Sequence, residues 1–171
     1  MEHFHLGVIA RLVKNQHLRY IYYGRIAEKS KLRLVKCLFS FLQLPISSRS
    51  GIEIPIKNGN IGSGINLIHP YNITVNDSAI ISNNVVLFKG CTIGSVRSGK
   101  RVGTPVIGNN VVVGCNSMIC GGITVGNNVL IAANSFVDFN VPDNSLVIGN
   151  PGKIIAKDNP TQDYIMERKC Y

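Results

Sequence analysis

The sequence predicts a mainly β protein: a left-handed parallel β-helix with a short helical segment at its N-terminus. Apolar residues recur at six-residue intervals through most of the chain from Ile61 to Val137, a period that fits neither an α-helix nor an ordinary strand and indicates a stacked repeat. A second column follows the first by four positions, so each six-residue unit forms one flat side of a triangular coil. Triplets such as Gly108-Asn109-Asn110 suit its sharp corners. The first column consists of Ile61, Leu67, Val75, Ile81, Leu87, Ile93, Ile107, Val113, Ile119, Val125, Ile131 and Val137.

Three regions are expected: a basic helical segment over residues 1–46, the β-helix over 47–157, and a C-terminal tail over 158–171. Helical spacing of apolar residues predicts two helices between about residues 6 and 44, and Pro45 is expected to end the second. The tail is polar, which predicts a short helix or a loose end. The apolar positions are Val8, Leu12 and Val13 in the first helix and Leu32, Val35, Leu38, Phe39 and Leu42 in the second.

Most of the positive charge lies in the N-terminal segment. Residues 1–50 hold nine Lys and Arg against two acids, a net charge of +7 out of +9 for the whole chain. Two interpretations stay open: a helical cap that covers the open end of the β-helix, and a basic amphipathic surface that rests on anionic lipid. No recognition motif accompanies the basic residues, so a nucleic-acid partner is not expected.

Composition restricts the location and the chemistry. No run of about 18 apolar residues is present, so we expect no membrane span, and the N-terminus lacks a signal-peptide pattern. Five cysteines without tight pairing indicate a reducing cytosol. A cytoplasmic location is therefore expected, with the inner membrane face as an alternative. Cys115 and Cys120 have no histidine nearby, so no metal site is expected.

The repeat is interrupted twice, and the interruptions are the candidate sites. The first, Leu67 to Asn72, contains His69, the only histidine beyond residue 17. A neutral imidazole can take a proton from a hydroxyl near neutral pH, and a structural role is the alternative. The second is an insert over residues 94–105, whose glycines and three cations predict an exposed loop. Loops on a rigid scaffold often carry function.

These residues resemble a known family, the hexapeptide-repeat acyltransferases, and in particular their serine acetyltransferase branch. The resemblance covers about residues 50–157, and His69 matches the catalytic histidine of that branch. The motifs that carry it are Ser50-Gly51-Ile52-Glu53-Ile54, Gly90-Cys91-Thr92-Ile93-Gly94, Pro105-Val106-Ile107-Gly108 and Gly149-Asn150-Pro151-Gly152-Lys153.

The resemblance implies direct acetyl transfer from acetyl-CoA. His69 would act as general base on an acceptor hydroxyl, and Glu53 would orient its imidazole. Backbone N–H groups at Gly94 or Ser95 would stabilise the tetrahedral oxyanion. Thr104 would help to shape the acceptor pocket.

The resemblance also implies a homotrimer with acetyl-CoA lying in a groove between subunits. Backbone groups of Cys115 and Ala133 would contact the pantetheine arm of the donor. Lys153 would face its phosphates.

Two departures from the branch bear on the acceptor. Ile68 stands where the branch has an Asp before the catalytic histidine, and Gly103-Thr104 stands where it has Arg-His. Gly103 offers no cation to a substrate carboxylate. The resemblance therefore favours O-acetylation of a saccharide hydroxyl, as in short serine-acetyltransferase-like proteins of capsule or surface polysaccharide synthesis. The alternatives are serine O-acetylation in cysteine biosynthesis, acetylation of a drug or amino sugar, and a non-catalytic β-helix scaffold.

Overall fold

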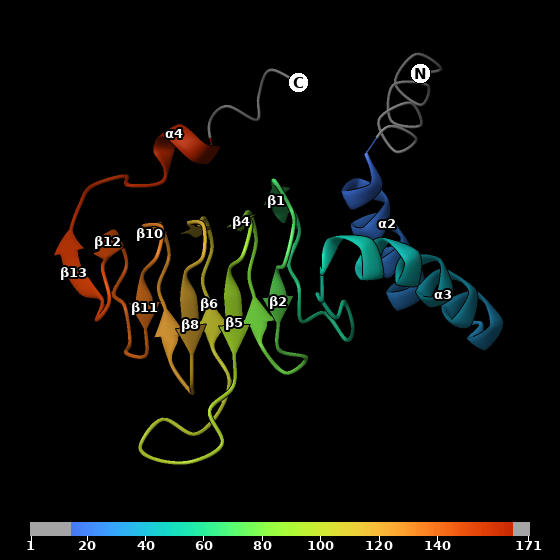
Figure 1. Ribbon diagram of the computed structural model, residues 1–171, viewed down its shortest axis with the longest axis horizontal. Helices are drawn as coiled ribbons and strands as arrows, with labels where there is room; N and C mark the ends of the chain where they lie inside the picture. The colour runs from blue at the N-terminus through green and yellow to red at the C-terminus, as the bar shows by residue number, and fades with distance from the viewer. Residues whose placement is uncertain (1–14, 166–171) are drawn as a thin grey trace.

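The computed structural model describes residues 15–165 and has the left-handed parallel β-helix that the sequence predicts (Figure 1). The strands form three sheets, one for each side of the coil, and only the last strand, β13, pairs antiparallel. The first sheet contains β1 (Asn66–Ile68), β4 (Val86–Phe88), β7 (Val112–Val113), β10 (Val129–Ile131), β12 (Ser145–Ile148) and β13 (Lys153–Ala156). The second contains β2 (Thr74–Val75), β5 (Thr92–Gly94), β8 (Met118–Cys120) and β11 (Phe136–Val137), and the third β3 (Ile80–Ile81), β6 (Val106–Ile107) and β9 (Thr124–Val125).

The apolar columns line the interior as predicted. Leu87 pairs with Val113 in register, and Val113 with Ile131, so each side chain stacks on the one a coil below. All three are fully buried. The corners use Asn in the left-handed conformation, for example Asn110 at φ 55° and Asn128 at φ 53°, since Asn adopts this conformation more readily than most residues.

Coil length shows where the repeat departs from regularity. Val106 pairs with Thr124, which gives a coil of 18 residues. Thr74 and Thr92 are also 18 apart, but Ile68 and Phe88 are 20 apart, so two extra residues lie in the corner that follows Ile68. Thr92 and Met118 are 26 apart, which places eight extra residues in the loop that begins at Gly94.

From residue 15 onward, two helices precede the β-helix: α2 (Gln16–Lys29) and α3 (Arg33–Ser50). The apolar face predicted from Val8, Leu12 and Val13 lies outside the described residues.

The expectation that Pro45 ends the second helix is wrong. Pro45 lies inside α3, which continues to Ser50 and ends at Gly51 in the left-handed conformation, φ 65°. Inside a helix, proline removes the hydrogen bond to the carbonyl four residues earlier, and its ring crowds that carbonyl. That residue, Phe41, is exposed, so water can satisfy the carbonyl.

The predicted apolar stripe of α3 is partly wrong. Val35, Phe39 and Leu42 are half-buried, but Leu32 is 68% exposed and Leu38 is 54% exposed. The reason is that α3 is apolar around most of its circumference, whereas α2 covers only one of its faces.

The helices cover the open end of the coil. The hydroxyl of Tyr20 accepts a hydrogen bond from the backbone N–H of Ile54 (3.1 Å) and donates one to the Ile54 carbonyl (3.3 Å). The Arg25 guanidinium donates to the carbonyl oxygens of Ile61 and Gly62. These side chains occupy backbone groups of the first coil that have no preceding strand, as the cap interpretation expects. No helix within residues 15–165 is long and apolar enough to cross a membrane.

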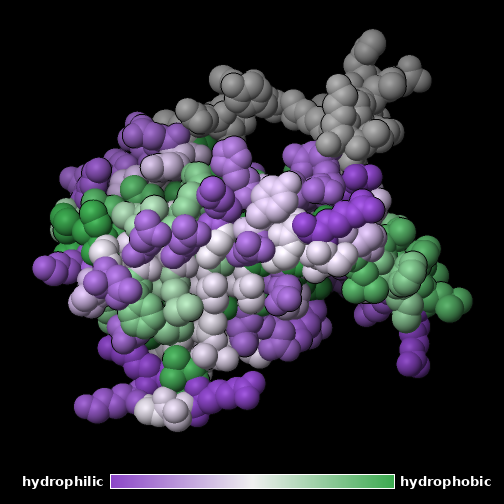
Figure 2. Space-filling view, in the orientation of Figure 1, coloured by the Kyte–Doolittle hydropathy of each residue, from purple (hydrophilic) through white to green (hydrophobic). Residues whose placement is uncertain are grey.

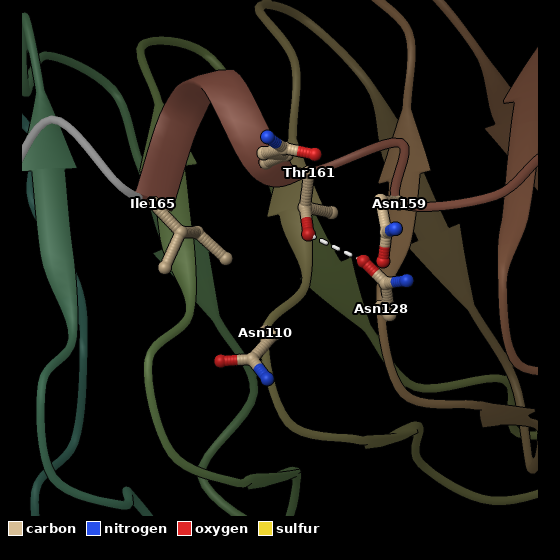
Figure 3. A pocket seen from close by; sticks show the side chains of 6 residues that line it. Asn110, Asn128, Asn159, Thr161 and Ile165 are labelled. Carbon is tan, nitrogen blue, oxygen red and sulfur yellow. Dashed lines mark hydrogen bonds between the residues drawn. The ribbon is translucent and has the colours of Figure 1, made fainter.

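The C-terminal segment is not a loose tail in its described part. The backbone N–H of Lys157 donates to the Asn144 carbonyl (3.0 Å), and the Thr161 hydroxyl donates to Oδ1 of Asn128 (2.6 Å; Figure 3). The short helix α4 (Gln162–Ile165) follows, and its Tyr164 ring meets Phe88 edge-on with centroids 6.1 Å apart. The segment thus runs back along the β-helix (Figure 1).

Candidate active site

His69 lies at the lengthened corner between the first and second sheets. It directly follows β1, is exposed, and adopts the left-handed conformation with φ 48°. Its carbonyl accepts a hydrogen bond from the N–H of Tyr71 (2.8 Å), which closes a tight turn. The two extra residues lengthen this corner, and His69 lies on its surface.

Glu53 lies on the outer face of the second sheet, one coil below β2. Its neighbours Ile52 and Ile54 are buried, so the Glu53 side chain points out. Its backbone pairs with Thr74, which begins the strand that the His69 corner leads into. Glu53 and His69 thus occupy neighbouring coils on one side of the prism. No hydrogen bond joins their side chains within residues 15–165, and the orienting role of Glu53 stays a prediction.

Gly94, Ser95 and Thr104 lie at the far end of the second sheet. Gly94 ends β5, and the Ser95 hydroxyl accepts a hydrogen bond from the Asn76 side-chain amide (3.2 Å). The Thr104 hydroxyl donates to the Ser78 carbonyl (3.1 Å). Strands of the second sheet begin at the His69 corner and end at the corner with Gly94, Ser95 and Thr104. At 3.3 Å per residue, these two corners lie about 15 Å apart. One protomer therefore does not bring His69 together with these three residues.

The insert forms a closed loop that projects from this far corner (Figure 1). Val96 and Gly103 exchange two backbone hydrogen bonds, of 3.0 and 2.9 Å. The three cations Arg97, Lys100 and Arg101 lie in the exposed tip between them. The loop base is thus fixed by hydrogen bonds, and its charges face solvent.

Cys115, Ala133 and Lys153 lie along the edge of the prism that starts at His69. Backbone hydrogen bonds connect successive corners of this edge, from Asn116 to the Lys89 carbonyl (3.0 Å) and from Asn134 to the Cys115 carbonyl (2.8 Å). Cys115 is half-buried, whereas Ala133 and Lys153 are exposed. With coils about 4.8 Å apart, the edge offers an extended donor a straight path of roughly 20 Å.

Three further residues near this edge were not predicted from the sequence. Lys89 is exposed at the corner one coil beyond His69, and its N–H donates to the Ile68 carbonyl (3.1 Å). Pairing the repeats in register would have found it. The ring of His17 packs edge-on against Tyr71 with centroids 5.7 Å apart, and burial lowers the pKa of His17. No local pattern signals that contact, because it joins a helix to a distant corner.

Other features do not coincide with this site. A hollow of about 360 Å³ beneath the C-terminal segment is lined by Asn110, Asn128 and Thr161, among others, and lies at the corner between the third and first sheets (Figure 3). Within residues 15–165 no cluster of three or more His, Cys, Asp or Glu side chains could hold a metal ion.

The repeat itself matches a family. Residues 104–138 match the family described as bacterial transferase hexapeptide (six repeats). The β-helix is that of the hexapeptide-repeat transferases.

Several relatives of this hexapeptide-repeat chain are serine acetyltransferases. The chloroplastic serine acetyltransferase 1 of Arabidopsis thaliana is 38% identical over 128 residues, which cover 73% of this chain and 40% of that protein. The Bacillus subtilis serine acetyltransferase is 33% identical over 129 residues, 73% of this chain and 59% of that protein.

Solved structures of serine acetyltransferases are also similar to this chain. The Neisseria gonorrhoeae serine acetyltransferase has a TM-score of 0.67 at 33% identity, covering 86% of this chain and 57% of that one. The Brucella abortus enzyme in complex with coenzyme A has a TM-score of 0.69 at 31% identity, covering 81% and 55%. The chain spans about half the length of these relatives. None of them is named as a polysaccharide O-acetyltransferase, so the comparisons lend that narrower assignment no support.

Proposed function

We propose that this chain is an O-acetyltransferase that moves the acetyl group of acetyl-CoA onto a small hydroxyl acceptor. One observation carries the proposal: His69 lies exposed at a lengthened corner of a β-helix, in a chain that resembles serine acetyltransferases over most of its length. A lone imidazole held at a surface corner suits proton transfer.

The proposed reaction is direct. The His69 imidazole takes the acceptor hydroxyl proton as the hydroxyl oxygen bonds to the thioester carbonyl carbon. N–H groups at Gly94 or Ser95 donate to the resulting oxyanion. The C–S bond then breaks, and the imidazolium returns the proton to the departing thiolate. Glu53 holds the imidazolium in orientation and balances its charge.

The proposed active unit is a homotrimer. His69 and the Gly94–Ser95 corner lie at opposite ends of the second sheet, so a site that uses both needs two protomers. The donor would lie between these protomers along the edge that carries Cys115, Ala133 and Lys153.

Serine is the first candidate acceptor, because the similar proteins are named for it. A saccharide hydroxyl is the second, and the identity of the loop residues favours it. Gly103 and Thr104 carry no charge for a carboxylate, and the Thr104 hydroxyl already donates to Ser78. Loss of a bidentate cation is hard to compensate for an amino acid substrate.

The test is thiol release from acetyl-CoA in the presence of serine or of a panel of sugars. His69→Ala should lower turnover about 10²–10⁴-fold, as for loss of a general base, with an unchanged circular dichroism spectrum. Asn159→Ala, at an exposed position of the C-terminal segment with the same φ of 48°, is the matched control and should retain turnover. Unchanged turnover in His69→Ala would reject the mechanism, and the productive acceptor decides between serine and sugars.

A cytoplasmic location is proposed with this activity, because free acetyl-CoA is the donor. We also propose contact with the inner membrane face. That proposal rests on helix α3 and does not depend on the proposed reaction.

A further inference from the structure

Helix α3 presents an apolar face that no described part of the chain covers. Leu34 is 85% exposed and Phe41 is 67% exposed, and Leu38 lies between them on the same face. The spacing of four and three residues aligns these side chains along the helix. Figure 2 shows this apolar surface where α3 lies in Figure 1.

The opposite face of α3 is fixed to the rest of the molecule. The Phe39 ring packs on Tyr23 with centroids 5.6 Å apart, and the Gln43 amide donates to the Tyr20 carbonyl (2.8 Å). Ile46 is buried. The exposed face is therefore presented permanently by a docked helix, and no rearrangement within α3 is needed to expose it.

Unpaired cations lie at the N-terminal end of α3, next to this apolar face. Lys29, Lys31 and Arg33 are exposed, and none forms an ion pair within residues 15–165. No acid occurs between Lys29 and Glu53. Lys31 and Arg33 lie at the N-terminal end of α3, where the helix dipole disfavours cations. Helix stability thus gives no reason for their placement.

We propose that α3 docks its exposed apolar face into the surface of an anionic phospholipid bilayer. The helix would lie in the interfacial plane with Leu34, Leu38 and Phe41 among the acyl chains and the cations at the lipid headgroups. A second copy of the chain is the less favoured occupant, because its α3 carries no acid and offers these cations no partner.

Tryptophan fluorescence tests the docking. The chain has no tryptophan, so Phe41→Trp places one reporter on the face. Its emission should shift to the blue with vesicles of phosphatidylcholine containing about one third phosphatidylglycerol, and hardly with phosphatidylcholine alone. Ile155→Trp, on β13 at the opposite end of the β-helix, is the matched control and should not shift (Figure 1).

Three double variants then separate the contribution of the cations from that of the apolar side chains. Lys31→Gln with Arg33→Gln should weaken vesicle binding about 25-fold, at about fivefold per cation near an anionic surface. Arg97→Gln with Lys100→Gln removes the same charge from the loop and should bind like wild type. Leu34→Gln with Phe41→Gln, in the chain without the reporter, should weaken sedimentation with vesicles about 100-fold. These side chains are exposed, so thermal unfolding should be unchanged.

Three results would overturn the proposal: no emission shift with anionic vesicles, equal binding to neutral vesicles, or a blue shift that depends on protein concentration in the absence of lipid. The last would identify a second copy as the occupant. None of these measurements needs acetyl transfer, so failure here leaves the proposed reaction untouched.

Discussion

His69 occupies a backbone conformation that ordinarily favours another residue. This corner has Asn72 at φ 54°, like the Asn residues near φ 55° in the regular corners, and it adds histidine at φ 48°. A left-handed residue other than Gly or Asn is disfavoured by about 1 kcal/mol. Asn would therefore suit the backbone at position 69 at least as well as histidine does.

His69→Asn tests this conflict between stability and function. We expect the free energy of unfolding to stay equal or rise by up to about 1 kcal/mol, while thiol release falls as in His69→Ala. Urea unfolding and the acetyl-CoA assay measure the two effects. A marked loss of stability would show that the imidazole supports the corner.

Cys91 lies in the core column, and burial raises the pKa of its thiol to about 12. The folded chain keeps this thiol protonated, whereas the unfolded chain ionises at the ordinary value near 9. This pKa difference contributes to the free energy of unfolding. The contribution is fully present below pH 9 and is lost as the pH rises through about 12.

We expect iodoacetamide at pH 8 to modify the exposed Cys37 and to leave Cys91 unmodified until urea unfolds the chain. Peptide mass mapping identifies which cysteines are modified. Modification of both at one rate in the native protein would contradict the burial of Cys91.

At the scale of elements, the helical cap is joined to the β-helix through few side chains. Tyr20 is the clearest, because one hydroxyl serves both backbone groups of Ile54. Tyr20→Phe should lower the free energy of unfolding by about 1–3 kcal/mol, since buried polar groups lose their partner. Tyr22→Phe, which alters an exposed ring, should have no effect in urea unfolding. Equal stability of both variants would mean that water replaces the hydroxyl.

Close stacking of corners makes some glycines indispensable. A Cβ at Gly114 would lie 2.6 Å from the backbone nitrogen of Ala133, whereas a Cβ at Gly94 would meet nothing nearer than 3.8 Å. Gly114→Ala should therefore lower stability by more than about 2 kcal/mol, and Gly94→Ala should unfold like wild type. The pair is compared by thermal unfolding, and a stable Gly114→Ala would show that coils can separate locally.

At the scale of the whole molecule, the six-residue period predicted the β-helix and its core because every coil repeats one solution. Leu87, Val113 and Ile131 stack as the pattern requires. The helices were predicted less well. The exposure of Leu38 depends on which face of α3 is covered by α2. That tertiary contact has no signal in the local sequence. The candidate site was found through departures from the repeat, but the pattern gave no distance between His69 and the loop.

Mixing inactive variants tests the two-protomer site. His69→Ala and a variant that lacks residues 94–104, and with them Gly94, Ser95 and Thr104, should each be nearly inactive alone. After joint refolding, random trimers should recover activity at about one quarter of their sites, those that receive one intact corner from each neighbour. Thiol release measures recovery. An inactive mixture would place the whole site in one protomer, and an active shortened variant would exclude the loop.

The antiparallel β13 has a consequence for self-association. A stack of identical turns is an open template, because each exposed end resembles the surface that the next turn would add to. Here the last turn meets a strand of opposite direction, and the first meets side chains instead of backbone. Neither end matches the other, so filamentous end-to-end growth is blocked at both termini of the spiral.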